Sequence, residues 1–160
     1  MRRLVDGLAG ACAIKVEITE SAASAYPDIV RSVAAQIHLM GVSLAIDDFG
    51  IGHSSMRVLA ELPFDTMKID VSFVSEMFDS AKALKLLRAM IRFGQTLELQ
   101  VVAEGVETEA QRQVLIESGI DLAQGYLFGK PVPLEVLART FSEPEAAPTR
   151  DPARVGAKPA

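Results

Sequence analysis

The chain has 160 residues, 49% of them hydrophobic, which is enough for one core but short of the about 250 residues that a complete α/β barrel typically needs. Its formal net charge is −5 and no run of Lys or Arg exceeds a pair, which argues against a general binder of nucleic-acid polymers or membrane surfaces. The single Cys12 excludes an internal disulfide, and no apolar stretch reaches the about 18 residues of a membrane span, so we expect a cytoplasmic protein.

The first 13 residues are similar to a secretory signal, with Arg2 and Arg3 ahead of an apolar run that ends in Ala11-Cys12-Ala13. Asp6 and two glycines interrupt the run, and cleavage after Ala13 would leave the mature chain starting within an expected strand. We therefore interpret this segment as the end of a helix that leads into a strand.

From Ile14 onward, short apolar strands alternate with amphipathic helices, which is typical of βα units in a parallel sheet. In the first full helix, Ile29, Val33 and Ile37 recur on one face, with Val30 and Ala34 beside them. The expected strands are 14–18, 42–46, 66–69, 99–103 and 122–127, and the expected helices are 27–41, 54–62, 81–93, 109–117 and a last one ending near Phe141. The pattern predicts an α/β fold of five βα units.

The last residues differ in composition from the rest of the chain. From about Ser142 the sequence holds four prolines among Ala, Glu and Arg, with almost no large apolar residue to bury. We expect one domain over residues 1–141 and a disordered tail over residues 142–160.

Acidic side chains, with one lysine and one glutamine, fall where the expected strands end. Because parallel strands deliver their carboxyl ends to one rim of a barrel, these groups are expected to converge on one site. Any one of them alone also fits a helix cap or a solvated charge, but several carboxylates at one rim repel each other unless hard cations such as Mg²⁺ or Mn²⁺ lie between them. The group comprises Glu17, Glu20, Asp47, Asp48, Lys68, Asp70, Glu104, Glu107 and Gln124.

Two other sites find less support. His38 and His53 do not have zinc-ligand spacing, and one cysteine provides no second soft ligand. The triplet Asp48-Phe49-Gly50 also occurs in protein kinases, but the kinase Gly-rich and catalytic-loop motifs are absent from the sequence. Neither a zinc centre nor a kinase is expected.

Five sequence blocks resemble, in order and spacing, the signature blocks of EAL domains. The resemblance implies part of a modified (β/α)8 barrel that hydrolyses cyclic di-GMP to linear pGpG with two Mg²⁺ or Mn²⁺ ions. The blocks are VEITES at 16–21, IDDFG at 46–50, LP at 62–63 with KID at 68–70, VAEGVET at 102–108 and QGYLF at 124–128.

The resemblance also implies a role for each residue of the rim. Lys68 resembles the residue that orients or deprotonates the attacking water, and Gln124 resembles its hydrogen-bonding companion. Glu20 resembles the residue that holds the loop after the second strand, with Asp70 and Glu107 as further support. The implied metal ligands are Glu17, Asp47, Asp48 and Glu104.

The family's Glu-Ala-Leu block and a following Asn, both implied metal ligands, lie upstream of the first block seen here, and no Glu-Ala-Leu triplet occurs in the 160 residues. We therefore expect the C-terminal part of the barrel, with weak or no activity alone. Its expected partners are cyclic di-GMP and either a second copy or the missing N-terminal barrel segment with a sensory domain. Two alternatives are a non-catalytic module that binds cyclic di-GMP or a protein, and a different metal-dependent barrel enzyme.

Overall fold

The computed structural model of the chain describes residues 14–52, 56–133 and 135–136. It divides into two compact units, residues 1–130 and residues 131–160, and all features below belong to the first. The segment with the signal-like start and Cys12, the expected cap Ser54, most of the expected last helix and the expected tail lie outside the described residues.

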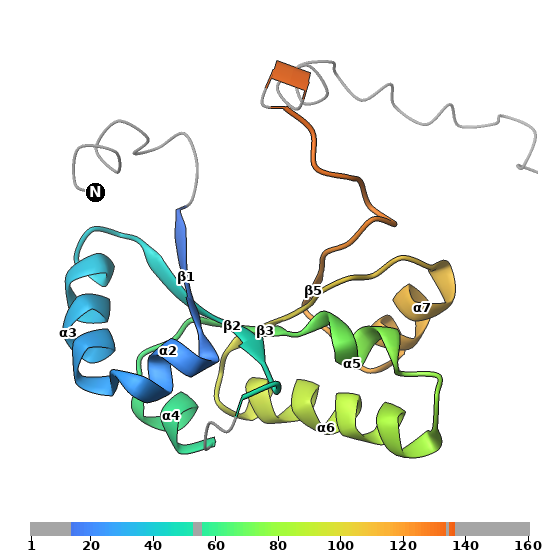
Figure 1. The fold of residues 1–160 in the computed structure, drawn as a ribbon, viewed down its shortest axis with the longest axis horizontal. Coiled ribbons are helices and arrows are strands. Elements are labelled where there is room, and N and C mark those ends of the chain that lie inside the picture. Colours follow the sequence, from blue (N-terminus) through green and yellow to red (C-terminus); the bar gives the residue numbers. More distant parts are fainter. Residues whose placement is uncertain (1–13, 53–55, 134, 137–160) are drawn as a thin grey trace, which may run out of the picture. The chain divides into compact units, whose positions relative to one another are not determined.

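Five parallel strands form one sheet in the order β1-β2-β3-β4-β5, with helices between them, so the predicted α/β architecture is confirmed (Figure 1). The elements in chain order are β1 Lys15–Thr19, α2 Glu20–Ala25, α3 Pro27–His38, β2 Ser43–Phe49, α4 Met56–Glu61, β3 Thr66–Ile69, α5 Val71–Ser75, α6 Ala81–Thr96, β4 Gln100–Ala103, α7 Glu109–Glu117 and β5 Leu122–Ala123.

Two short helices, α2 and α5, were not expected from the sequence. Each begins directly after a strand, where a polar residue caps it: the Thr19 side chain accepts a hydrogen bond from the amide of Ala22, and Asp70 accepts one from the amide of Ser72. Helices of about five residues are too short to show an amphipathic period, so their caps are the only local signal.

The strand boundaries also differ from the prediction. β2 continues to Phe49, which places Asp47 and Asp48 inside the strand, whereas β5 covers only Leu122–Ala123 rather than 122–127. Beyond Ala123 the backbone turns to the loop after β4, because the amide of Val106 donates to the Gln124 carbonyl and the amide of Leu127 donates to the Val106 carbonyl.

One face of the sheet holds the hydrophobic core. Figure 1 shows α2, α3, α4 and α6 along one side of the strands, and α3 contacts β2 while α6 contacts β4. The residues buried here include Leu44 and Ile46 of β2, Met67 and Ile69 of β3, and Val101 and Ala103 of β4.

Helix α3 buries part of the predicted apolar face. Val30, Ala34 and Ile37 are buried, whereas Ile29 and Val33, which were predicted to share a face with Ile37, are 61% and 39% exposed. The buried residues of α3 lie on the side that packs toward β2, the strand that the helix contacts.

Candidate metal centre

The ammonium group of Lys68 lies at the centre of a cluster of carboxylates. Its Nζ is 2.8 Å from Glu17 Oε2, 2.8 Å from Asp47 Oδ1 and 2.8 Å from Glu104 Oε1. These residues come from β1, β2 and the end of β4, while Lys68 lies between them on β3. The sheet therefore brings together four of the predicted site residues that are far apart in sequence.

Asp47 and Asp48 reach the same side of the sheet because β2 is irregular at this point. Ile46 pairs with Met67 and Phe49 pairs with Ile69, so two residues of β2 face the single Lys68 of β3. This is the geometry of a β-bulge. Within the bulge, Asp48 adopts the left-handed conformation, with a φ of 54°. In a regular strand, successive side chains would point to opposite faces.

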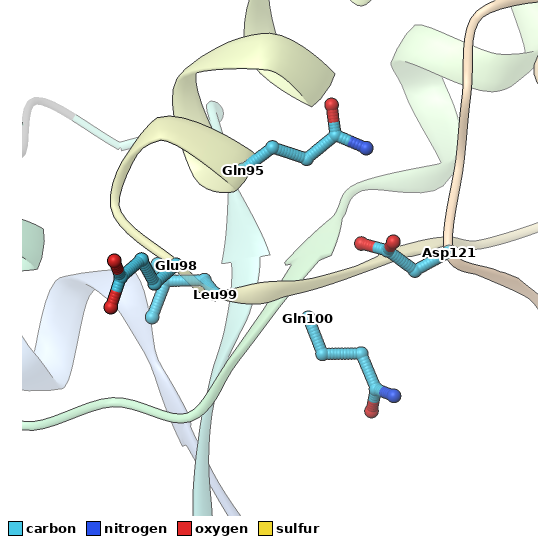
Figure 2. Close-up of a pocket in the computed structure, with 5 residues that line it drawn as sticks. All are labelled: Gln95, Glu98, Leu99, Gln100 and Asp121. Carbon is cyan, nitrogen blue, oxygen red and sulfur yellow. The ribbon is translucent and has the colours of Figure 1, made fainter.

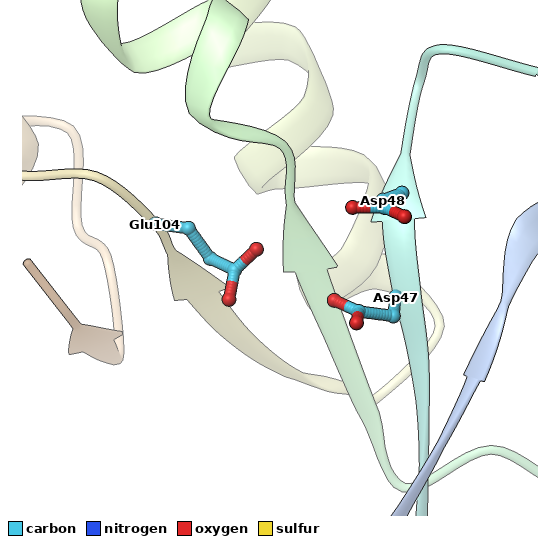
Figure 3. Close-up of side chains that lie close together, drawn as sticks. All are labelled: Asp47, Asp48 and Glu104. Carbon is cyan, nitrogen blue, oxygen red and sulfur yellow. The ribbon is translucent and has the colours of Figure 1, made fainter. Parts of the chain in front are cut away.

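The carboxylates of Asp47, Asp48 and Glu104 form a group that could hold a metal ion. One oxygen of each lies within 4.8 Å of the others, and Figure 3 shows Asp47 and Glu104 directed toward one another across β3. All three side chains are half-buried, and every donor is a carboxylate oxygen. Such a set fits a hard cation such as Mg²⁺ or Mn²⁺ and does not fit zinc, which prefers nitrogen and sulfur ligands.

The cluster changes the acid–base behaviour of its members. Burial acts to lower the pKa of Lys68, but its hydrogen bonds to Asp47 and Glu104, with that to Glu17, outweigh burial and raise the pKa above its ordinary value. Burial raises the pKa of the Glu104 carboxyl, and the nearby Lys68 ammonium only partly offsets this effect. In the absence of a metal ion, Lys68 is therefore a charged hydrogen-bond donor at neutral pH.

Glu20 supports the loop that follows β2. Its side chain is buried at the start of α2, and its Oε2 accepts hydrogen bonds from the backbone amides of Gly50 at 2.7 Å and Gly52 at 3.3 Å. A Cβ atom at Gly52 would lie 2.8 Å from Glu20 Oε1, so the loop approaches the carboxylate closely. The loop-holding role that the family resemblance implies for Glu20 stays a prediction.

Asp70 and Glu107 lie at the predicted rim, with different surroundings. Asp70 is buried and caps α5 through Ser72. The side chain of Glu107 is exposed, and its backbone amide, rather than its carboxylate, donates a hydrogen bond to Gln111 Oε1. The structure thus places Asp70 as a helix cap and leaves Glu107 at the surface of the loop after β4.

Gln111 is a supporting residue that the sequence interpretation missed. It is buried at the start of α7, where its Oε1 accepts hydrogen bonds from the amides of Glu107 and Thr108, and its Nε2 donates to the Val74 carbonyl. Thr108 and Gln111 form a capping box. The spacing of a Thr followed three residues later by a Gln was the signal that could have identified it.

Gln124 lies beside the cluster, just after β5. It lines a cavity of about 250 Å³ together with Lys68, Glu17 and Lys15, on the sheet face opposite the core helices. The remaining lining residues are Thr66, Val102, Leu122 and Ala123. Lys68 therefore has open space on the side of Gln124.

A second cavity, of about 400 Å³, lies near the beginning of β4 and is lined by Gln95, Glu98, Leu99, Gln100 and Asp121 (Figure 2). Its polar groups already serve the fold: Asp121 accepts a hydrogen bond from the Val101 amide, and Gln95 donates one to the Gly119 carbonyl. We assign no chemistry to this cavity.

Among the described residues, no helix is both long and apolar enough to cross a membrane.

Comparison with known proteins gives the family. The family model described as "EAL domain" matches residues 1–131. The cyclic di-GMP phosphodiesterase NbdA of Pseudomonas aeruginosa is 44% identical over 131 residues, which are 82% of this chain and 17% of NbdA. The chain thus spans less than one fifth of the length of this relative.

Solved structures show the same fold. The PaMucR phosphodiesterase, in complex with c-di-GMP, is 41% identical with a TM-score of 0.73, over 77% of this chain and 50% of that one. Klebsiella pneumoniae BlrP1, in a complex with manganese and cyclic di-GMP, is 34% identical with a TM-score of 0.72, over 81% of this chain and 34% of that one. The predicted resemblance is confirmed, as is the fold of a partial α/β barrel, and the chain belongs to the EAL domain family.

Proposed function

We propose that this chain supplies much of the catalytic face of a metal-dependent phosphodiesterase that hydrolyses cyclic di-GMP to linear pGpG. The observation that carries the proposal is the convergence of Glu17, Asp47 and Glu104 on Lys68, with Asp48 in the same carboxylate group. Support comes from NbdA, which is named a cyclic di-GMP phosphodiesterase, and from BlrP1, whose structure contains manganese and cyclic di-GMP.

The charges of the site explain why a cation is needed. Three carboxylates contact one ammonium group and that of Asp48 lies near two of them, so the face repels a phosphodiester until cations screen it. Glu17, Asp47, Asp48 and Glu104 would hold the metal. When bound, a pair of Mg²⁺ or Mn²⁺ ions supplies Lewis-acid polarisation of the phosphodiester and a more acidic water.

Lys68 and Gln124 are proposed to position the water and the scissile phosphate. Despite burial, hydrogen bonds to its carboxylate partners raise the pKa of Lys68 above its ordinary value, so without cations its ammonium donates hydrogen bonds and does not accept a proton. A role as general base requires that neighbouring cations lower its pKa. Gln124 lines the same cavity and offers both an amide donor and a carbonyl acceptor.

The proposal is tested by turnover of cyclic di-GMP in Mg²⁺ or Mn²⁺. We expect weak or no turnover by the 160-residue chain alone, and metal-dependent turnover when it is joined to the upstream strands of an EAL barrel. Asp47→Ala and Lys68→Ala should abolish this turnover, while Arg31→Ala, on the exposed face of α3, should not. A completed barrel that binds metal but does not hydrolyse the dinucleotide would overturn the proposal.

A second candidate is a non-catalytic module that binds cyclic di-GMP or a protein partner. The cavity beside Lys68 favours it, because Lys15 and Gln124 line this cavity and carry hydrogen-bond donors that could bind a ligand without any catalytic step. Calorimetric titration separates the two: binding that continues in Lys68→Ala, without hydrolysis, supports the module. In either case we place the protein in the cytoplasm, with a second copy or an upstream barrel segment as its partner.

A further inference from the structure

Lys68 places a positive charge among three carboxylates. Its Nζ contacts three carboxylates at 2.8 Å each, and its side chain is only 9% exposed. The other lysine on this sheet face, Lys15, contacts neutral groups instead: its Nζ lies 2.7 Å from Thr66 Oγ1 and 3.1 Å from Gln100 Oε1. The contrast shows that the sheet directs one particular ammonium group into the carboxylate cluster.

The contacts of Lys68 overlap with the candidate metal ligands. Asp47 and Glu104 belong to the group that could hold an ion, and the same two residues receive hydrogen bonds or ion pairs from Lys68. A Mg²⁺ ion lies about 2.1 Å from its oxygen ligands. An ion bound to these two carboxylates would therefore lie near the ammonium, and the two like charges would repel each other.

We propose that Lys68 is a built-in counter-ion that a divalent cation must displace before the metal centre can form. In the metal-free chain the ammonium neutralises part of the charge of the carboxylate cluster and holds its members together. It thereby lowers the affinity of the site for metal. The proposal rests on the metal centre described under the proposed function and adds a competition between that metal and one side chain.

The structure also offers a place for the displaced side chain. The cavity of about 250 Å³ beside Lys68 is bounded by Val102 and Leu122, which can contact the four-carbon stem, and by Gln124, whose carbonyl oxygen can accept from the ammonium. The same residue can thus neutralise the acids without metal and face Gln124 once metal is bound.

The first test measures Mn²⁺ binding by calorimetry on the 160-residue chain. Lys68→Met keeps the length of the stem and removes the charge, so it should bind Mn²⁺ at least about tenfold more tightly than the wild type. Lys68→Arg keeps the charge and should bind no more tightly than the wild type. Lys15→Met, the matched control on the same sheet face, should change the affinity by less than about threefold because solvent and salt screen its charge.

The outcomes separate this inference from the proposed function. If Lys68→Met binds Mn²⁺ as tightly as the wild type or more weakly, the proposed competition is wrong. The proposed metal centre is then still supported, because the chain binds metal. Absence of binding in the wild type and in folded Lys68→Met removes the metal centre itself, and the inference with it. Asp47→Asn should lose affinity in both the wild-type and the Lys68→Met backgrounds.

A second test avoids the variant altogether. In the wild-type chain, Mn²⁺ should increase the rate at which an amine-acylating reagent modifies Lys68, measured by mass spectrometry of the proteolysed chain, because displacement exposes the ammonium to the cavity. The rate at Lys15 is the internal control and should stay constant. Slower or unchanged modification of Lys68 at saturating Mn²⁺ would show that the ion and the ammonium bind together, which contradicts the inference.

Discussion

The carboxylate of Glu20 accepts a hydrogen bond from the backbone amide of Gly50 at 2.7 Å and so ties the start of α2 to the end of β2. Gly50 adopts a φ of 108°, two residues after the left-handed Asp48. The hydrogen bond therefore holds the turn that follows the two aspartates, although Glu20 itself is not part of the carboxylate cluster.

Replacement of Glu20 tests this support. Glu20→Ala leaves the Gly50 and Gly52 amides without their acceptor, and we expect a loss of about 1–3 kcal/mol in the free energy of unfolding. Mn²⁺ affinity should fall as well, because the aspartates lose their fixed geometry. Urea unfolding and calorimetry measure the two effects. Glu76→Gln, at an exposed carboxylate, is the control, and a Glu20→Ala variant with wild-type stability would contradict the role.

Asp48 should contribute to metal binding more than to stability. Asn tolerates the left-handed conformation as well as Asp does, so Asp48→Asn should change the free energy of unfolding by less than about 0.5 kcal/mol. The loss of a charged ligand should weaken Mn²⁺ binding by about tenfold or more. Asp48→Ala is expected to be less stable than Asp48→Asn, since Ala is strained at this φ; unchanged metal affinity in Asp48→Asn would remove Asp48 from the ligand set.

Gln111 should prove important for stability despite its distance from the cluster. Gln111→Ala removes the acceptor of the Glu107 and Thr108 amides and the donor to Val74, with an expected cost of about 1–3 kcal/mol in chemical unfolding. Gln113→Ala, on the exposed side of the same helix, should cost less than about 0.5 kcal/mol. Equal effects in the two variants would argue against the capping box.

Gly125 allows the chain after β5 to pass next to the loop after β4. A Cβ atom there would lie 2.2 Å from the backbone N and O of Val106, so Gly125→Ala must shift backbone and should cost about 1–3 kcal/mol or more. At Gly94 of α6 the nearest atoms belong to the side chains of Val101 and Met67 rather than to backbone, the Met67 side chain is flexible, and the helix gains from alanine. Gly94→Ala should therefore cost less in thermal unfolding; the opposite order would contradict this account.

Glu104 should give the metal-free chain a measurable pH dependence. Its pKa is raised above the ordinary value of 4.5, mainly by burial, so the folded chain holds this proton more tightly than the unfolded chain does. The corresponding stability is present below 4.5 and is lost as the pH rises through the raised pKa. Glu104→Gln cannot ionise, so in EDTA its stability relative to wild type should increase across this window.

Urea unfolding at about pH 4 and about pH 7 measures the difference between Glu104→Gln and wild type at each pH. Glu109→Gln, at an exposed carboxylate of α7, should show no such change. A difference for Glu104→Gln that stays constant, or decreases as the pH rises, would contradict the expected sign.

The alternation of apolar strands and helices was sufficient to predict the parallel sheet, because each βα unit carries its own hydrophobic pattern. It also predicted that the acidic residues share one rim, and the structure brings Glu17, Asp47 and Glu104 within reach of Lys68. Their roles as metal ligands, and those of Lys68 and Gln124 in catalysis, remain predictions.

Other features depend on contacts that no local pattern encodes. The predicted apolar face of α3 included Ile29 and Val33 with Val30 and Ala34 beside them, yet the structure buries only Val30 and Ala34 of these four. The early end of β5 results from hydrogen bonds to Val106, which is distant in sequence. Likewise, the contacts of Lys68 with three carboxylates depend on the register of four strands, which the sequence does not give.

The bulge in β2 makes the acidic pair sensitive to chain length. Because two residues of β2 face one residue of β3, removal of either Asp47 or Asp48 would restore an uninterrupted ladder and leave a single aspartate there. Such a deletion would let the neighbouring strands pair more regularly and would at the same time break up the carboxylate group of Asp47, Asp48 and Glu104. One additional residue in β2 thus allows two adjacent aspartates to lie on the same face of the sheet.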